Sequence, residues 1–296
     1  MGFDDLMTQG GEWLAIFGAG FFAGAINVVV GSGTLVSFPV LVLLGYPPVV
    51  ANMSNTIGLV PGSISGVIAY RRELLRRSAV IRVLLPASAV GGIAGALVLL
   101  VLPAGVFSAV VPWLIGIGVG LVLLGPALKR AVTDPAPAGV RASVLPTSPG
   151  AGPVVQAMDT RRTTVAGPLH AVFATKAALL VAVFGAFLLG IYGGYFGAAQ
   201  GILLIGLLGV LSQLDLQELN GIKNLVVLAV NLIAAVVFTI VSPGMIDWVL
   251  AGLIAAGAAC GGLVGGRFAK RLSPRLLRTL IITVGVATIV FMIATN

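Results

Sequence analysis

Apolar residues gather in ten stretches along this chain, and nearly all charged residues lie between the stretches. A helix needs about 20 apolar residues to cross the hydrocarbon core of a bilayer. The pattern therefore predicts an all-α polytopic membrane protein. The stretches expected as helical segments are 13–30, 34–45, 50–70, 79–101 and 107–128 in the first half, and 171–192, 199–211, 219–241, 246–265 and 276–294 in the second.

The second stretch of each half, 34–45 or 199–211, is shorter than a membrane span. At about 1.5 Å per residue, such a helix reaches little more than halfway across a bilayer. Each half therefore has the same order of about five segments, of which the second is short and re-entrant.

Clusters of basic residues follow different stretches in the two halves. The first cluster comes after the third stretch of its half, and the second comes after the fourth. Since Lys and Arg collect in cytoplasmic loops, this shift by one segment predicts two inverted-topology repeats, which are a transporter architecture. The clusters are Arg71, Arg72, Arg76, Arg77 and Arg82 in the first half, and Arg267, Lys270, Arg271, Arg275 and Arg278 in the second.

The composition agrees with a membrane location. Hydrophobic residues make up 58% of the chain and charged residues 9%, whereas a soluble domain carries about 25% charged residues. The net charge of +8 comes from basic residues that flank apolar runs, which indicates topology anchors and not a nucleic-acid surface. Cys260 and His170 are the single cysteine and histidine, which excludes a disulfide framework, a Cys-rich metal site and a His-cluster metal centre.

The chain divides into an N-terminal transmembrane repeat (1–130), a flexible linker (131–168) and a C-terminal transmembrane repeat (169–296). The linker is rich in Pro, Gly, Ala, Ser and Thr and has basic residues around it, so we expect it to be cytoplasmic. Both termini are then expected outside. Residues 1–12 contain no Lys or Arg, so we expect the first stretch to be retained and not cleaved as a signal peptide.

Each short stretch follows a glycine-rich break. Gly31-Ser32-Gly33-Thr34 precedes the first short stretch, and a run from Gly190 to Gly201 precedes the second. Glycine allows backbone angles that interrupt a helix, and interrupted backbone inside a membrane must be paired by protein or by a watery cavity. Half-helices that start at the breaks from opposite sides would point unpaired N–H groups and positive dipole ends at each other, which makes an anion site.

The alternative for these glycines is close helix packing alone, as we expect for Gly91 with Gly95 and for Gly261 with Gly265. Polar residues after each short stretch are open to two interpretations as well, because amides buried in lipid can serve a ligand or bond to a neighbouring helix. For Asn231 we favour the structural role, a hydrogen bond to a neighbouring helix. Lys223 either reaches the cytoplasmic surface or lies near the anion.

The candidate substrate-binding residues come from the two breaks and from the polar groups near them. No catalytic residue, metal ligand or cofactor is predicted. The candidates are Asn27, Gly31, Ser32, Gly33, Thr34, Asn52, Ser54, Asn55, Tyr192, Gly197, Gln200, Gly201, Asn220, Lys223 and Asn224.

Several motifs carry a family resemblance. They are Gly31-Ser32-Gly33-Thr34 with Phe38-Pro39, Gly45-Tyr46-Pro47-Pro48, Ala51-Asn52-Met53-Ser54-Asn55, and Tyr192-Gly193-Gly194-Tyr195-Phe196-Gly197 followed by Gly201. With these motifs the chain resembles the TauE/SafE family of sulfite and organosulfonate exporters, over most of its length outside the linker. The resemblance implies a permease of the bacterial inner membrane for small sulfur-containing or related organic anions.

A secondary transporter of small anions is therefore the leading prediction. Asp215 and Glu218 lie at a cytoplasmic edge and Asp247 at an outer one, so the usual proton-relay carboxylate is missing from the membrane segments. An inside-negative potential favours anion exit by about 2.3 kcal/mol per charge for each 100 mV. We therefore expect export, and a coupling ion and a homodimer stay open.

Two other function classes remain as alternatives. A membrane subunit that only assembles or stabilises partners would tolerate alanine at the polar motif residues as well as at other interior positions. An intramembrane enzyme could use Ser32 between its two glycines, but a nucleophilic serine needs a base. The single His170 lies at the far end of the linker, which argues against catalysis.

Overall fold

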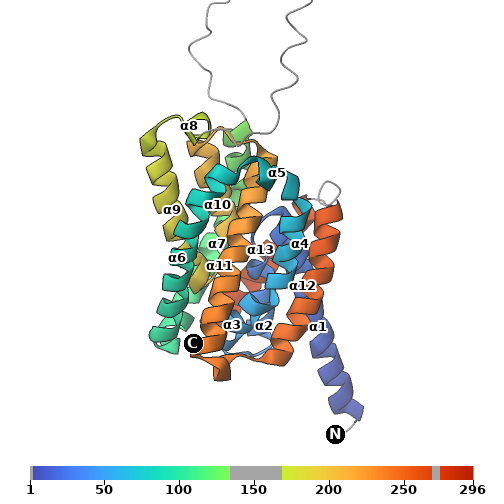
Figure 1. Cartoon of the computed structure of the whole chain (residues 1–296). Coiled ribbons are helices and arrows are strands. Elements are labelled where there is room, and N and C mark those ends of the chain that lie inside the picture. Colours follow the sequence, from blue (N-terminus) through green and yellow to red (C-terminus); the bar gives the residue numbers. More distant parts are fainter. Residues whose placement is uncertain (1–2, 134–168, 269–273, 296) are drawn as a thin grey trace, which may run out of the picture.

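Figure 1 shows the computed structural model of the chain, whose described residues are 3–133, 169–268 and 274–295. Apart from the short 3-10 helix η2 (Pro243–Met245), every regular element in these ranges is an α-helix, which confirms the all-α prediction. The helices are α1 (Phe3–Val29), α2 (Thr34–Leu43), α3 (Pro48–Gly58), α4 (Val60–Ala69), α5 (Arg71–Arg76), α6 (Ser78–Val101), α7 (Ala104–Thr133), α8 (Leu169–Val172), α9 (Lys176–Tyr195), α10 (Gln200–Leu211), α11 (Leu216–Val241), α12 (Trp248–Phe268) and α13 (Pro274–Thr295).

Six helices within the described residues are long and apolar enough to cross a bilayer. The helices α2 and α10 have 10 and 12 residues and are too short to do so, as predicted for the second segment of each half. The spanning segments are Gln9–Val29, Ser78–Val101, Ala104–Leu124, Lys176–Tyr195, Leu216–Val241 and Trp248–Arg267.

Some predicted boundaries differ from the structure. The segment predicted over 50–70 is divided into α3 and α4 at Leu59, because Pro61 lacks the N–H that an unbroken helix would use there. The basic loop after residue 70 contains the short helix α5. Helix α7 runs to Thr133, past the predicted start of the linker at 131, and residues 134–168 of the linker lie outside the described residues.

The two halves of the chain pack reciprocally. Helix α1 of the first half lies along α12 of the second, and α9 of the second half lies along α6 of the first. In the same way, α2 packs against α13 and α10 packs against α7. In Figure 1, α1 rises from the end marked N whereas α9 descends from the opposite end. This exchange of equivalent partners is the pattern that a pair of inverted repeats would produce.

Glycines bring the reciprocal pairs into close contact. A Cβ on Gly95 of α6 would meet the carbonyl oxygen of Ile191, and a Cβ on Gly261 of α12 would meet the carbonyl oxygen of Phe21. A Cβ on Gly265 would lie 2.8 Å from the Cα of Ala25. The close packing predicted for Gly91, Gly95, Gly261 and Gly265 is therefore confirmed, since each of these positions lacks room for a side chain.

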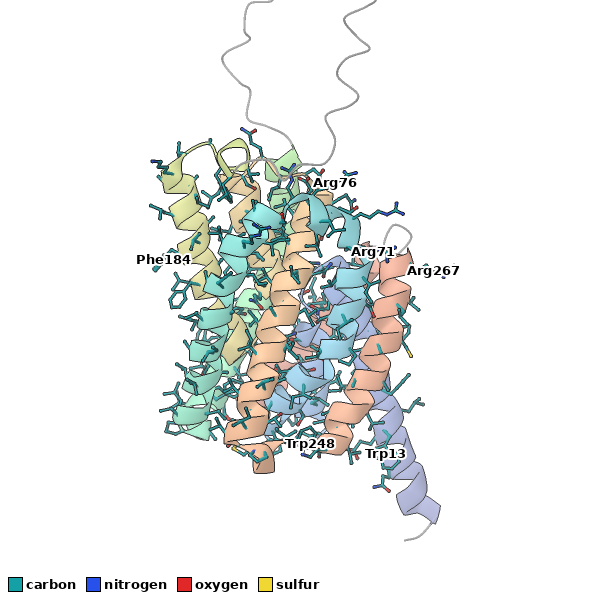
Figure 2. All side chains as sticks on the ribbon, in the orientation of Figure 1. Trp13, Arg71, Arg76, Phe184, Trp248 and Arg267 are labelled. Atoms are coloured by element: carbon teal, nitrogen blue, oxygen red, sulfur yellow. The ribbon has the colours of Figure 1, made fainter. Side chains whose placement is uncertain are left out.

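The basic and aromatic ends of the bundle are opposite. Figure 2 shows Arg71, Arg76 and Arg267 toward one end and Trp13 with Trp248 toward the other. Both chain termini lie at the tryptophan end, and α8 lies at the arginine end (Figure 1). The labelled arginines, predicted on the cytoplasmic side, and Trp248, next to the loop 242–246 predicted outside, therefore lie at opposite ends of the bundle.

Candidate functional site

Helices α1 and α9 each stop at a glycine-containing break in the interior of the bundle. Gly31, after α1, has a φ of 85°, and Gly197, after α9, has a φ of 75°. These left-handed angles are readily adopted by glycine and interrupt the helix. Ala199 also has a positive φ of 62°, which is costly for a residue with a Cβ and marks a tightly determined backbone.

The two short helices begin at the breaks and run toward opposite ends of the bundle. The loop after α2 is tied to the tryptophan end, since the Tyr46 hydroxyl donates to Glu12 Oε1 over 2.8 Å. Burial and this hydrogen bond raise the pKa of Tyr46 to about 12. The loop after α10 is tied to the arginine end, since the Gln213 N–H donates to the Val172 carbonyl in α8 over 3.0 Å. The N-termini of α2 and α10 therefore both lie toward the middle.

The two breaks are in direct contact. The Gly201 N–H donates to the carbonyl oxygen of Gly31 over 3.1 Å. A Cβ on Gly31 would lie only 2.8 Å from the Cα of Gly201. Both positions therefore need glycine for the close approach of two backbones, and the contact brings the starts of α2 and α10 together.

Each break leaves consecutive backbone N–H groups without an acceptor. Apart from the Gly201 bond to Gly31, the first hydrogen bonds after the breaks are from Leu35 N–H to the Ser32 carbonyl and from Ile202 N–H to the Ala199 carbonyl. Within the described ranges, the N–H groups that come just before or open the two helices donate no hydrogen bond. These are the N–H groups of Ser32, Gly33, Thr34, Ala198, Ala199 and Gln200. Such orphan donors at the positive end of a helix favour a negatively charged ligand.

Polar side chains around the breaks are buried and lack partners among the described residues. The Ser32 hydroxyl and both amide atoms of Gln200 have no hydrogen bond, although each residue is only 1% exposed. The Gln200 side chain lies against Gly193, where a Cβ would collide with it. An unpaired polar group in an apolar interior costs about 1–3 kcal/mol or more of stability. A bound ligand that forms hydrogen bonds with these groups would remove that cost. The full set is Ser32 Oγ, Asn52 Oδ1, both amide atoms of Asn55, Tyr192 Oη, both amide atoms of Gln200, and Asn220 Oδ1.

Lys223 of α11 reaches the breaks from the side. It is 0% exposed, and its ammonium donates to the carbonyl oxygens of Val28 over 2.9 Å and of Asn27 over 3.3 Å. Its Cδ would lie 2.8 Å from a Cβ on Gly31 and 2.9 Å from a Cβ on Gly201. The alkyl chain of Lys223 therefore passes beside the contact between the breaks, which excludes the interpretation that Lys223 extends to the cytoplasmic surface.

The carbonyl ends of both broken helices are capped from the opposite half of the chain. Asn224 of α11 donates its amide to the Val28 carbonyl of α1 over 3.4 Å. Asn52 of α3 donates its amide to the Tyr195 carbonyl of α9 over 3.0 Å. The two asparagines thus have matching structural roles in the two halves. One interpretation of the motif amides was that they bond to a neighbouring helix, and Asn52 and Asn224 do so.

Some predicted site residues bond elsewhere. The Asn27 amide donates to Ser63 Oγ of α4 over 3.0 Å. The Ser54 hydroxyl accepts from the Asp247 N–H over 3.0 Å, near the start of α12. Asn220 donates over 2.8 Å to the Leu216 carbonyl of its own helix. The polar groups of these three side chains therefore bond to residues outside the two breaks, although the Asn27 Cβ would lie only 3.0 Å from a Cβ on Gly33.

The structure places residues beside the breaks that are not among the predicted site residues. A Cβ on Gly197 would lie 3.9 Å from both Asn231 Oδ1 and Thr34 Oγ1, so Asn231 faces the second break. Phe38, Phe107 and Phe196 form a cluster of edge-to-face rings with centroids 5.1 to 6.4 Å apart. These rings wall the second break with apolar surface, which raises the strength of polar interactions beside it.

The groups gathered at the two breaks are hydrogen-bond donors and acceptors. No group of three or more His, Cys, Asp or Glu residues that could hold a metal ion occurs in the part of the chain that the structure describes. Ser32 has no base as a partner there, and His170 belongs to α8 at the arginine end of the bundle. Orphan N–H groups, hydroxyl and amide donors and one ammonium are the kinds of donor to which an oxyanion binds strongly.

Comparisons with known proteins point to a transporter. A protein-family model described as "Sulfite exporter TauE/SafE" matches residues 16–292. A "Probable membrane transporter protein ORF9" from Sinorhizobium sp. is 31% identical over 103 residues, which cover 34% of this chain and 38% of that relative. The chain thus aligns with well under half of the relative's length. No solved structure gives a significant match.

Proposed function

We propose that this chain, which belongs to the TauE/SafE sulfite exporter family, carries small anions such as sulfite, organosulfonates or related organic acids out of a bacterial cell. Its class as a multi-pass membrane transporter, and not an enzyme, follows from the family and from the six apolar helices. The observation that carries the proposed substrate chemistry is the contact between Gly31 and Gly201, which brings two helix N-termini with orphan N–H groups together.

The charges around the breaks favour an anion over a cation. Lys223 places an ammonium beside the breaks. Glu218, the buried carboxylate on the same helix, is held by Arg77 at 2.6 Å from Nε to Oε1. Charge-assisted bonds from an ammonium and from N–H groups to an oxyanion are stronger than neutral ones, and the apolar surroundings strengthen them further.

The proposed transport cycle depends on two inverted repeats, 1–130 and 169–296. The reciprocal pairing of α1 with α12 and of α9 with α6 supports this division. Ser32 and Gln200 are almost fully buried, so a guest between them is enclosed in this conformation. Entry and exit therefore require the two halves to move against each other, as in rocking-bundle transporters.

The proposed orientation puts the arginine end of the bundle in the cytoplasm. Arg71, Arg76 and Arg267 lie toward this end (Figure 2), as the positive-inside rule requires of cytoplasmic loops. The linker 131–168 is then cytoplasmic, and both termini are outside. With the membrane potential negative inside, a released anion gains about 2.3 kcal/mol per charge for each 100 mV, which supports export.

Flux through proteoliposomes tests this function. Vesicles with the purified protein are loaded separately with sulfite, thiosulfate, sulfoacetate, taurine or simple carboxylates, and exit is followed with and without an inside-negative potential. We expect exit of at least one anion, accelerated by the potential. Absence of flux for every anion, or slowing by the potential, would contradict the proposal.

Paired serine variants tie the flux to the breaks. Ser32→Ala removes an unpaired hydroxyl beside Gly31, whereas Ser88→Ala removes an equally buried hydroxyl that donates to the Ala186 carbonyl between α6 and α9. We expect the first variant to lose flux and the second to keep it. Equal flux in both would favour a membrane subunit that only stabilises partners.

A further inference from the structure

The ammonium of Lys223 occupies a carbonyl site at the end of a broken helix. It donates to the Val28 carbonyl at 2.9 Å and to the Asn27 carbonyl at 3.3 Å. Carbonyl groups at unwound helix ends are the ligands with which some broken-helix transporters hold a coupling Na⁺. An ammonium has three donors and makes two hydrogen bonds to the described residues, which leaves one donor for a guest.

No carboxylate balances the charge of Lys223 within the described part of the chain. The ion pair among those residues joins Arg77 to Glu218, and Glu218 also caps the start of α11 by accepting from the Asp215 N–H over 3.2 Å. A fully buried cation without a counter-charge is costly. An anion bound at the helix starts would supply the missing negative charge near Lys223.

The matching helix end in the other half carries no charge. There the Tyr195 carbonyl of α9 accepts from the neutral amide of Asn52. The two halves therefore supply one fixed positive charge between them at these helix ends. One cation is neutralised by a guest that carries a single negative charge.

We propose that Lys223 is a tethered cation, which fills the carbonyl site at the end of α1 in place of a separate coupling cation and pairs with a singly charged oxyanion. The inference rests on the proposed function, because it names the ion balance and the substrate charge of the same site. It also explains why Gly31 and Gly201 both leave room for the Lys223 chain. Transport by this mechanism needs no Na⁺ and moves net negative charge.

The first test needs no variant. Exit of methanesulfonate, a monoanion, and of sulfate, a dianion, is measured from proteoliposomes with Na⁺ or with N-methylglucamine as the sole cation. We expect flux of methanesulfonate to be faster than that of sulfate and unchanged when Na⁺ is replaced. A requirement for Na⁺, or faster flux of sulfate, would overturn the inference.

The second test removes the positive charge of Lys223 by substitution and then restores it with a free amine. Lys223→Met keeps an apolar chain beside Gly31 and Gly201, and we expect methanesulfonate flux to fall by roughly 30-fold or more, since loss of a buried charged partner costs at least about 2 kcal/mol. Lys223→Ala leaves space for a small amine. We expect 1-propylammonium to restore part of its flux, and tetramethylammonium, which has no N–H donor, to restore none.

The outcomes separate this inference from the proposed function. Full flux in Lys223→Met, or equal rescue by both amines, overturns the tethered cation while transport itself stands. Failure of the wild-type protein to move any anion overturns the proposed function first. Gel filtration and thermal unfolding of both variants check that they fold. If neither variant folds, the measurements of Na⁺ dependence and of substrate charge on the wild-type protein decide the inference.

Discussion

The N–H of Gly201 donates to the carbonyl oxygen of Gly31 across 3.1 Å, and this bond joins the break after α1 to the break after α9. The two residues are 170 positions apart in sequence (201 − 31), in different halves of the chain. Their contact holds the starts of α2 and α10 beside each other. Any change that separates the two backbones is therefore expected to disturb the proposed site.

Gly201→Ala tests this contact. The added Cβ would lie 2.7 Å from the Cα of Gly31 and 2.8 Å from its carbonyl oxygen, so we expect a loss of about 1–3 kcal/mol in stability and a loss of flux. The control is Gly252→Ala on α12, where a Cβ would meet nothing within 4 Å. That variant is expected to be neutral or more stable by up to about 1 kcal/mol. Unfolding in detergent and flux in proteoliposomes measure both effects, and wild-type behaviour of Gly201→Ala would contradict the contact.

Asn52→Ala tests the cap on the second broken helix. Loss of the amide leaves the Tyr195 carbonyl without its donor, and an unpaired buried carbonyl costs about 1–3 kcal/mol. We expect a lower melting temperature and slower flux. Asn220→Ala is the control for the melting temperature alone, because the Asn220 amide donates only within its own helix. An equal fall in melting temperature for the two substitutions would show that burial of the amide, and not the cap, determines the stability.

Glu218→Gln tests the anchor at the arginine end. Glu218 pairs with Arg77 and completes the cap on α11 by accepting from the Asp215 N–H. Arg77 is partly exposed, so the pair is screened, whereas the Gln oxygen can still accept from the Asp215 N–H. We therefore expect a loss of about 0.5–1 kcal/mol, from the pair alone. Thermal unfolding of Glu218→Gln and of Glu73→Gln provides the comparison, since Glu73 makes no ion pair with another described residue. Similar melting temperatures for the two variants would contradict the role given to Glu218.

Cysteine labelling tests the orientation. In a Cys260→Ala background, Gly150→Cys in the linker and Thr295→Cys near the C-terminus are treated with a membrane-impermeant maleimide in intact cells. We expect label at position 295 and none at 150 until the membrane is opened. The reverse result would place the arginine end outside and refute the assigned orientation.

The breaks were predictable because their signals are local. A stretch of 10 to 12 helical residues is visibly short, and a glycine motif precedes each one. Partners of single polar residues were harder to predict, because they depend on which helix lies opposite. Asn27, Ser54 and Asn220 look like Asn52 and Asn55 in sequence, yet α4, the start of α12 and α11 itself supply their partners.

Other features follow from tertiary packing alone. The ring cluster of Phe38, Phe107 and Phe196 brings together α2, α7 and the break after α9. No short sequence pattern predicts this contact. The division at Leu59 had a local signal in Pro61. Lys223 was placed in the motif by sequence, but its contact with the end of α1 required the fold.

The most direct test of the two helix starts as an anion site is an experimental structure determined with selenite, whose selenium gives an anomalous signal. The account predicts a peak between the breaks, within hydrogen-bonding distance of N–H groups in 32–34 and 198–200 and close to the Lys223 ammonium. A peak found only elsewhere, such as at the arginine-rich surface, would contradict it.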